Sequence, residues 1–188
     1  TISEAGFWGL AATLTKRDES TETAEFVIEV REASFGVALG AEVPATESAT
    51  VSSVDDEALL SSDGKPDLDL YQLSVAQAVT NGRPSVVGFI TPAFCETRWC
   101  TPVYDALATA EEEFGEAANF VHIEVYDMVT YRADFETLSW GPAMAEWGLQ
   151  SEPWLMVIDE NGRLSAKLSG PVSFEELKLD IEAVLANE

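Results

Sequence analysis

Apolar residues alternate with polar ones along the first 40 residues, and this period of two is typical of β-strands. Residues 7–14 and 26–31 both carry an apolar side chain at every second position, and the polar stretch 16–22 lies between them. The pattern therefore predicts a β-hairpin. Because a two-stranded hairpin is only marginally stable in water, it must pack on the main domain, extend its sheet or pair with another chain.

The next part of the chain has no sustained periodicity. Residues 42–69 are rich in Ser, Thr, Asp, Glu and Pro, which is typical of a linker or a long surface strap. We therefore predict three parts, namely an N-terminal β-hairpin extension at 1–41, an acidic linker or strap at 42–69 and a folded domain at 70–188.

Strand and helix patterns alternate in the C-terminal two thirds of the chain. In order, the predicted elements are a short helix ending near 81–82, a strand at 85–90, a helix at 101–114, a strand at 119–125, a short helix at 142–147, strands at 154–158 and 163–168 joined by an Asn-Gly turn, and a helix that begins at Ser173 with a capping box. Residues 128–137 fit neither pattern clearly. This order predicts the α/β class, with a mixed central sheet covered by helices on both faces.

Charge is the outlying property of the composition. The chain of 188 residues has 34 acidic and 10 basic residues, a net charge of −24. Such a surface repels nucleic acid and anionic membranes, so we expect neither as a partner. An acidic surface of this kind is typical of a protein that stays soluble in high salt or is exported to a saline exterior. It is equally compatible with an ordinary, well-solvated surface. No run of 18 apolar residues is present, so we expect no membrane insertion by this chain.

The candidate chemistry lies in Cys95 and Cys100, the two cysteines of the chain. They directly follow the predicted strand 85–90 and precede the predicted helix 101–114. Unpaired amide groups at a helix start stabilise a thiolate, which is the nucleophile in thiol–disulfide exchange. The alternatives are a structural disulfide, of low entropic value because its loop is short, and free or metal-bound thiols.

The order of elements and four local sequences resemble the thioredoxin superfamily across residues 70–188. The strand running into Phe94-Cys95 looks like the strand that leads to the family's reactive cysteine, and the helix 101–114 looks like the long helix after it. Glu152-Pro153-Trp154 looks like the loop that carries the family's cis-proline, and 159–188 looks like the end of the fold. The resemblance implies a thioredoxin-like fold and a thiol–disulfide oxidoreductase.

The family motif is Cys-x-x-Cys, whereas four residues separate the cysteines here. In one alignment Cys95 matches the nucleophile by its distance from the strand. In the other, Trp99-Cys100-Thr101-Pro102-Val103 matches the family's Trp-Cys-Gly-Pro-Cys, with about five residues inserted before it. We prefer the first, because it inserts nothing before the motif. The family's buried acidic residue falls on Phe89, so its proton-shuttle role is absent.

The resemblance implies a role for each candidate residue. Cys95 attacks a substrate disulfide and Cys100 resolves the mixed disulfide, while Arg98 helps to lower the pKa of Cys95. A cis Pro153 places the backbone of Glu152 beside the sulfurs, and a carboxylate there raises the pKa of the thiols. The predicted substrate-binding residues are Phe94, Trp99, Glu152, Pro153 and Trp154, and Trp140 is a further candidate for the rim of the site.

His122 is the single histidine, in the middle of a predicted strand. It could bind a metal with the two cysteines, as in copper-delivering relatives of the fold, but its spacing is wrong and a fourth ligand is not evident. We therefore expect a sheet histidine with hydrogen-bond partners, no metal site and no cofactor.

The leading prediction is thiol–disulfide exchange on protein or small-molecule thiols and disulfides. The first rival is a non-catalytic binding or scaffold module with a structural disulfide, and the second is a protein that handles copper through its thiols. The resemblance and the surface charge indicate an extracytoplasmic location. Because the sequence begins at Thr1 with no signal-like segment, we expect a chain whose signal or anchor lies outside it. Substrate, redox direction and oligomeric state stay open.

Overall fold

The computed structural model describes residues 4–33, 35–95 and 97–186, and the chain divides into two compact units, 1–34 and 35–188. The first unit is the predicted hairpin. Its strands β1 (Gly6–Thr15) and β2 (Thr21–Val30) are antiparallel. Pairs such as Trp8 with Ile28 and Leu10 with Phe26 put the alternating apolar residues on one face, as predicted.

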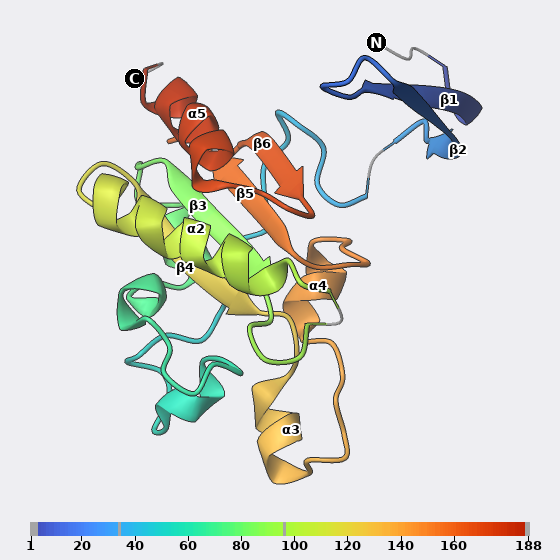
Figure 1. Ribbon diagram of the computed structural model, residues 1–188. Helices are drawn as coiled ribbons and strands as arrows, with labels where there is room; N and C mark the ends of the chain where they lie inside the picture. The colour runs from blue at the N-terminus through green and yellow to red at the C-terminus, as the bar shows by residue number, and fades with distance from the viewer. Residues whose placement is uncertain (1–3, 34, 96, 187–188) are drawn as a thin grey trace. The chain divides into compact units, whose positions relative to one another are not determined.

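The second unit is built on a four-stranded mixed sheet with the order β4-β3-β5-β6 (Figure 1). Strands β3 (Ser85–Ile90) and β4 (Asn119–Glu124) are parallel, and helix α2 (Cys100–Phe114) connects them. Strands β5 (Trp154–Ile158) and β6 (Leu164–Ser169) complete the sheet, with β5 antiparallel to both β3 and β6. The predicted α/β class, with a mixed central sheet and an N-terminal hairpin, is confirmed.

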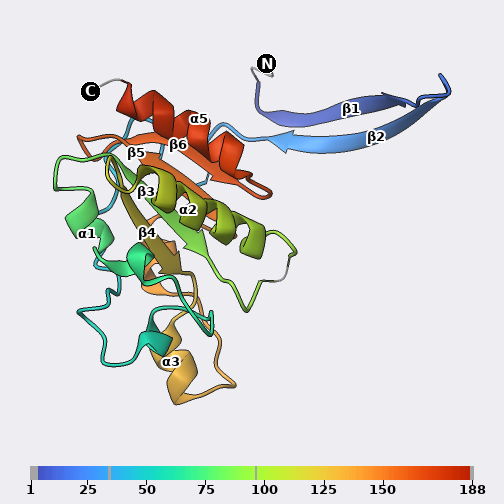
Figure 2. The ribbon, with the colours of Figure 1, turned by 60° about the vertical axis from the view of Figure 1, so that its left-hand side comes forward.

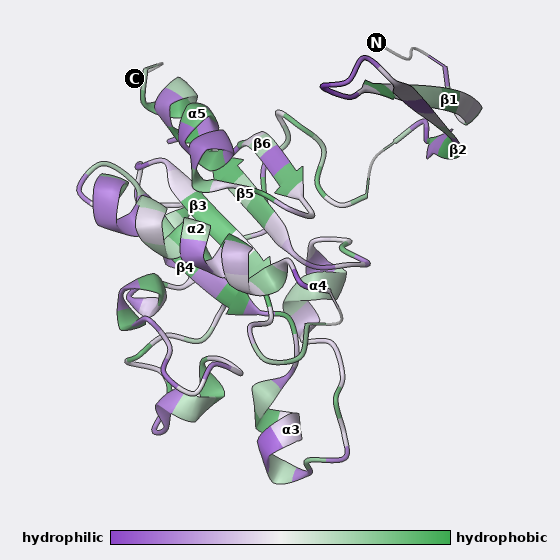
Figure 3. Cartoon of the chain, viewed as in Figure 1, coloured by the Kyte–Doolittle hydropathy of each residue, from purple (hydrophilic) through white to green (hydrophobic). Residues whose placement is uncertain are grey.

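Helices cover both faces of this sheet, because the central strands are buried on both sides. Helix α2 and helix α5 (Phe174–Leu185) lie side by side on one face (Figure 2). Helix α1 (Val75–Ala78) and helix α4 (Pro142–Glu146) contribute to the core on the other face. Hydropathy colouring shows the apolar residues concentrated along β3 and β5 (Figure 3).

The segment without periodicity belongs to the second unit and packs on its core through single buried residues. It contains the short 3-10 helix η1 (Glu57–Leu59) and the beginning of η2 (Leu68–Tyr71). Leu60 of the segment and Tyr71 at the end of η2 are buried in the core beside α2. Thr46 lies under the other face, where its hydroxyl accepts a hydrogen bond from Nε1 of Trp147 at 2.8 Å. Whether 1–41, 42–69 and 70–188 behave as separate parts stays a prediction.

The segment with no clear pattern, residues 128–137, forms helix α3 over Met128–Ala133. Asp127 caps it by accepting hydrogen bonds from the amides of Val129 and Thr130. Within the described residues, no helix is both long and apolar enough to cross a membrane.

Gly88 sets how closely α2 approaches the sheet. A Cβ atom at this position would lie 2.6 Å from Cδ2 of Leu107, which is a fully buried side chain of α2. A methyl group there forces the helix or its side chains to shift within a close-packed core.

Gly88→Ala is therefore expected to lower the free energy of unfolding by about 1–3 kcal/mol. Chemical denaturation of the wild type and the variant measures the difference. Gly64→Ala is the matched control, because a Cβ atom there has no neighbour within 4 Å. Equal losses in the two variants would contradict the close approach of α2.

Candidate functional site

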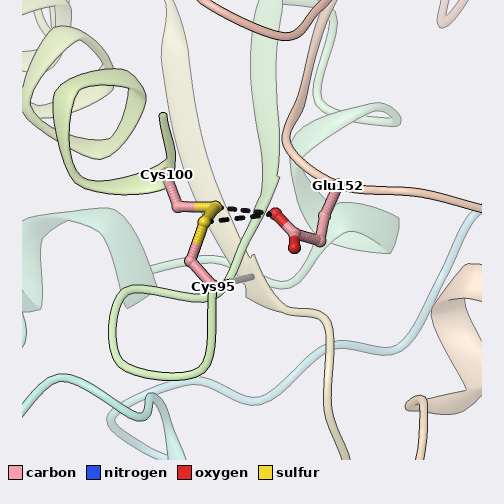
Figure 4. A group of neighbouring side chains, drawn as sticks. All are labelled: Cys95, Cys100 and Glu152. Atoms are coloured by element: carbon pink, nitrogen blue, oxygen red, sulfur yellow. Dashed lines mark hydrogen bonds between the residues drawn. A yellow bond between two sulfur atoms is a disulfide. The ribbon is translucent and has the colours of Figure 1, made fainter. Parts of the chain in front are cut away.

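Cys95 and Cys100 form a disulfide at the end of the sheet where β3 stops, with their Cα atoms 6.1 Å apart (Figure 4). Cys95 lies half-buried in the loop after β3, whereas Cys100 is the first residue of α2 and is fully buried. Among the described residues no side chain caps this helix. The first amide groups of α2 therefore face the site without a side-chain acceptor, and their partial positive charge acts on Cys100.

This placement separates two properties that we expected Cys95 to combine. Cys95 has the more accessible sulfur, but it lies five residues before the helix start that was expected to stabilise its thiolate. Cys100 lies at the start of the helix, but its side chain is inaccessible to solvent. The exposure of Cys95 thus favours the family alignment in which Cys95 is the nucleophile. The position of Cys100 at the start of α2 favours the alignment in which Cys100 is the nucleophile.

Glu152 is the acidic residue of the site. Its Oε2 atom lies 2.7 Å from Sγ of Cys100 and 3.8 Å from Sγ of Cys95 (Figure 4). A sulfur in a disulfide carries no hydrogen, so these contacts become S–H···O hydrogen bonds only when the pair is reduced. A carboxylate at this distance opposes the formation of a thiolate, most strongly at Cys100.

The peptide bond between Glu152 and Pro153 is cis, as the resemblance implied. Pro153 is buried, and β5 begins directly after it at Trp154. The antiparallel pairing of Phe89 with Trp154 brings this loop next to the loop that carries the cysteines.

Buried polar groups hold the beginning of the cysteine loop. The carboxylate of Glu124, at the end of β4, accepts a hydrogen bond from the amide of Ser62 at 2.8 Å. The Ser62 hydroxyl accepts one from the amide of Ala93 at 3.1 Å and lies 3.3 Å from the Thr91 hydroxyl. Burial raises the pKa of Glu124, and the hydrogen bonds from Ser62 and Thr91 oppose that shift. These groups therefore position the loop without touching the sulfurs.

His122 is confirmed as a sheet histidine with hydrogen-bond partners on both ring nitrogens. Its Nε2 atom lies 3.0 Å from the carbonyl oxygen of Ile90, which can only accept, so Nε2 carries the hydrogen. Nδ1 then accepts a hydrogen bond from the Tyr71 hydroxyl. Complete burial lowers the pKa of His122 to about 4, and the hydrogen bond to Ile90 opposes that shift. Since Ile90 ends β3, this contact fixes the point from which the cysteine loop departs.

The predicted binding residues lie in different surroundings. Phe94 packs edge-on against Tyr126 and Tyr131, with ring centroids 5.9 and 4.8 Å apart. Trp99 precedes α2 with 41% of its surface exposed, and Trp154 is half-buried against the core.

The remaining two candidates are both exposed. Arg98 lies in the loop between the two cysteines, and Trp140 lies in the loop before α4, where its ring faces that of Tyr126 at 6.3 Å. Their roles, like those of the binding residues, stay predictions.

Sequence reasoning missed one hydroxyl beside the sulfurs and the polar residues that anchor the cysteine loop. The Thr97 hydroxyl lies 3.3 Å from Sγ of Cys95, and the polar residues Ser62 and Glu124 anchor the loop. A threonine two residues after a cysteine is a weak signal that could have been found. Ser62 had none, because it belongs to the segment without periodicity.

Comparison with family models and with curated proteins gave no match. Among solved structures, similarity was found to a DsbF homologue from Corynebacterium diphtheriae, with 19% identity and a TM-score of 0.45 over 59% of this chain and 76% of that one. It was also found to a thioredoxin-family thiol:disulfide interchange protein from Chlorobium tepidum TLS, with 18% identity and a TM-score of 0.45 over 79% and 99% of the two chains. DsbF from MTB gave 19% identity and a TM-score of 0.42 over 76% and 98%. At these identities the similarity is one of fold.

The burial of His122 predicts a pH dependence of stability. The pKa of His122 is about 4 in the folded protein, against about 6.5 in an unfolded chain. The neutral ring therefore stabilises the fold fully above about pH 6.5, and this contribution is lost as the pH falls toward 4, by at most about 1.4 kcal/mol per pH unit.

His122→Gln removes this titration but also two buried hydrogen bonds. The variant is expected to be less stable than the wild type at pH 7, with a difference that shrinks by pH 4.5. Urea denaturation at the two pH values measures it. A difference that stays constant would show that His122 does not titrate on unfolding.

Proposed function

We propose that the chain carries out thiol–disulfide exchange through Cys95 and Cys100, on protein or small-molecule thiols and disulfides. The observation that carries the proposal is the asymmetry of the disulfide, in which one sulfur is accessible and the other is buried at a helix start. Exchange needs an accessible sulfur to attack and a leaving sulfur whose thiolate is stabilised, and Cys95 and Cys100 meet these two needs separately.

The reaction follows from this asymmetry. A substrate thiolate attacks Sγ of Cys95, the disulfide breaks, and its electron pair leaves on Sγ of Cys100. The amide groups at the start of α2 favour that thiolate, and the Glu152 carboxylate opposes it. A second substrate thiolate then attacks the substrate sulfur of the mixed disulfide and releases Cys95. The substrate gains a disulfide and the protein gains two electrons, and the reverse sequence reduces a substrate disulfide.

The surroundings of the pair suit an extended or flexible substrate. Trp99 presents an exposed ring beside Cys100, and the backbone at Glu152 and Pro153 lies next to the sulfurs. The aromatic residues Phe94 and Trp154 flank the same two loops. We propose that these residues contact the substrate and that Arg98 supports the thiolate of Cys95. We also propose an extracytoplasmic location, on the strength of the acidic surface and the disulfide.

The burial of Cys100 favours a second candidate, in which the disulfide is structural and the domain is a binding or scaffold module. A sulfur that no reagent can reach contributes to a disulfide that is hard to reduce. The two candidates therefore differ in the reduction potential of the same bond.

A glutathione redox titration, followed by alkylation and intact mass, separates these candidates. For an exchanging pair we expect reversible reduction with a midpoint between about −120 and −270 mV. A disulfide that resists reduction below about −300 mV would instead make the pair structural.

The two single cysteine variants identify the nucleophile. Cys100→Ser leaves the accessible thiol of Cys95 and is expected to form a stable mixed disulfide with a substrate. Cys95→Ser leaves the buried thiol and is expected to form none and to abolish the reduction of insulin disulfides. The opposite pattern, measured by non-reducing electrophoresis and mass, would assign the nucleophile to Cys100.

Glu152→Gln tests the electrostatic role of the carboxylate. Loss of a negative charge 2.7 Å from Sγ of Cys100 is expected to lower the pKa of the reduced thiols and to raise the midpoint potential. Glu112→Gln is the matched control, because it removes the same charge at an exposed position of α2. The thiol pKa values are measured from the absorbance at 240 nm as a function of pH. Equal thiol pKa values in Glu152→Gln and Glu112→Gln would exclude an electrostatic role of Glu152.

A further inference from the structure

We infer that reduction of the pair creates a binding site for a divalent cation of the Zn²⁺ class, with the sulfurs of Cys95 and Cys100 and the carboxylate of Glu152 as ligands. This inference goes beyond thiol–disulfide exchange. It requires that the disulfide can be reduced, but not that the reduced pair reacts with a substrate.

The three ligand atoms already lie together. The two sulfurs and a carboxylate oxygen of Glu152 are all within 4.8 Å of one another (Figure 4). Tetrahedral Zn²⁺, with bonds of about 2.3 Å to sulfur and about 2.0 Å to oxygen, holds its ligands roughly 3.5–4 Å apart. Reduction releases the sulfurs from their bond and lets them separate toward that distance. The oxygen needs little displacement, because it lies 2.7 and 3.8 Å from the two sulfurs.

The loops that carry the ligands are held by other contacts. The cysteine loop is anchored by hydrogen bonds from Ala93 to Ser62 and from Ser62 to Glu124, and Cys100 is fixed in the first turn of α2. Glu152 precedes the buried Pro153 at the start of β5. A site held by a helix and a strand keeps its ligands together when the disulfide is absent.

The cation resolves an electrostatic conflict in the reduced site. Two thiolates beside the carboxylate of Glu152 place like charges within a few ångströms, which disfavours both thiolates. A divalent cation between them reverses the effect, because each negative ligand then stabilises the bound ion and a coordinated thiol is deprotonated outright. The net charge of −24 also draws cations toward this protein.

The ligand set selects among metals. Thiolates alone suit Cu(I) and Zn²⁺ equally, whereas a carboxylate is a hard ligand that favours Zn²⁺. Cys95 and Glu152 are half-exposed, so the fourth position is open to water or to a thiol of another molecule. The site therefore differs from the copper centre with His122 considered from the sequence, since His122 is buried and bonded elsewhere.

Loading of the site is a balanced reaction. A dithiol donor supplies two electrons to the disulfide and is itself oxidised to a disulfide, and the protein becomes a dithiol. Zn²⁺ then displaces the two thiol protons to solvent and forms two Zn–S bonds. Bound zinc protects the thiols, so the ion holds the protein in its reduced form until it is removed.

The inference is tested with protein that has been reduced with dithiothreitol and desalted without oxygen. Alkylation and intact mass first establish that both thiols are free. Zn²⁺ is then titrated in competition with a chromophoric chelator, and Cd²⁺ is added separately to record its sulfur-to-metal charge-transfer band. We expect one equivalent of Zn²⁺ to bind, a Cd²⁺ band from two thiolates, and no binding by oxidised protein.

Glu152→Gln is expected to weaken Zn²⁺ binding at least about tenfold, while Glu112→Gln leaves it unchanged. Cys95→Ser is expected to abolish the Cd²⁺ band of the pair. Equal Zn²⁺ affinities of the wild type and Glu152→Gln would overturn the inference. It would also be overturned if the reduced protein, with both thiols shown to be free, bound no Zn²⁺. A disulfide that cannot be reduced in the folded protein would overturn it too. Exchange activity without zinc retention would refute this inference alone and leave the proposed function standing.

Discussion

The antiparallel pairing of β3 with β5 is the constraint on which the candidate site depends. Phe89 pairs with Trp154 and Gly88 with Leu155, so the end of β3 lies beside the beginning of β5. The loop after β3 carries the cysteines, and the loop before β5 carries Glu152. Two segments more than 50 residues apart in the chain therefore meet through the register of a single strand pair. A slip of one residue in that register would turn the buried side chains of β5 to the opposite face.

The parallel neighbour of β3 supplies the polar support for the same end of the sheet. Strand β4 places His122 and Glu124 on alternate positions, and both reach across to the segment that continues β3. Burying these groups costs free energy, which their hydrogen bonds offset only if all partners are in place. Within the described part of the chain, every buried side-chain polar atom has such a partner. The cysteine loop therefore leaves the sheet from a fixed point.

The sequence was sufficient to predict the elements whose residues repeat regularly. The buried strand at 85–90, the Asn161-Gly162 turn and the capping box of Ser173 with Glu176 all follow from local rules, and the structure has each of them. The cis form of the bond before Pro153 followed from the resemblance alone.

The strap and the electrostatics of the cysteines could not be predicted in the same way. In the strap, Leu60 is buried and Ser62 is half-buried through contacts with distant residues, and no local period marks them. Helix α2 starts one residue earlier than expected, so that Cys100 is its first residue and Cys95 lies five residues before it. Boundaries depend on tertiary packing, so a shift of one residue is ordinary.

Cys100 therefore experiences two opposing fields. The first amide groups of α2 favour its thiolate, and the Glu152 carboxylate at 2.7 Å opposes it. The two effects act on the same sulfur in opposite directions. A positive charge beside the Glu152 carboxylate would offset its effect on the thiolates and so favour the reduced pair. With 34 acidic residues and only 10 basic ones, the protein has little positive charge of its own to supply.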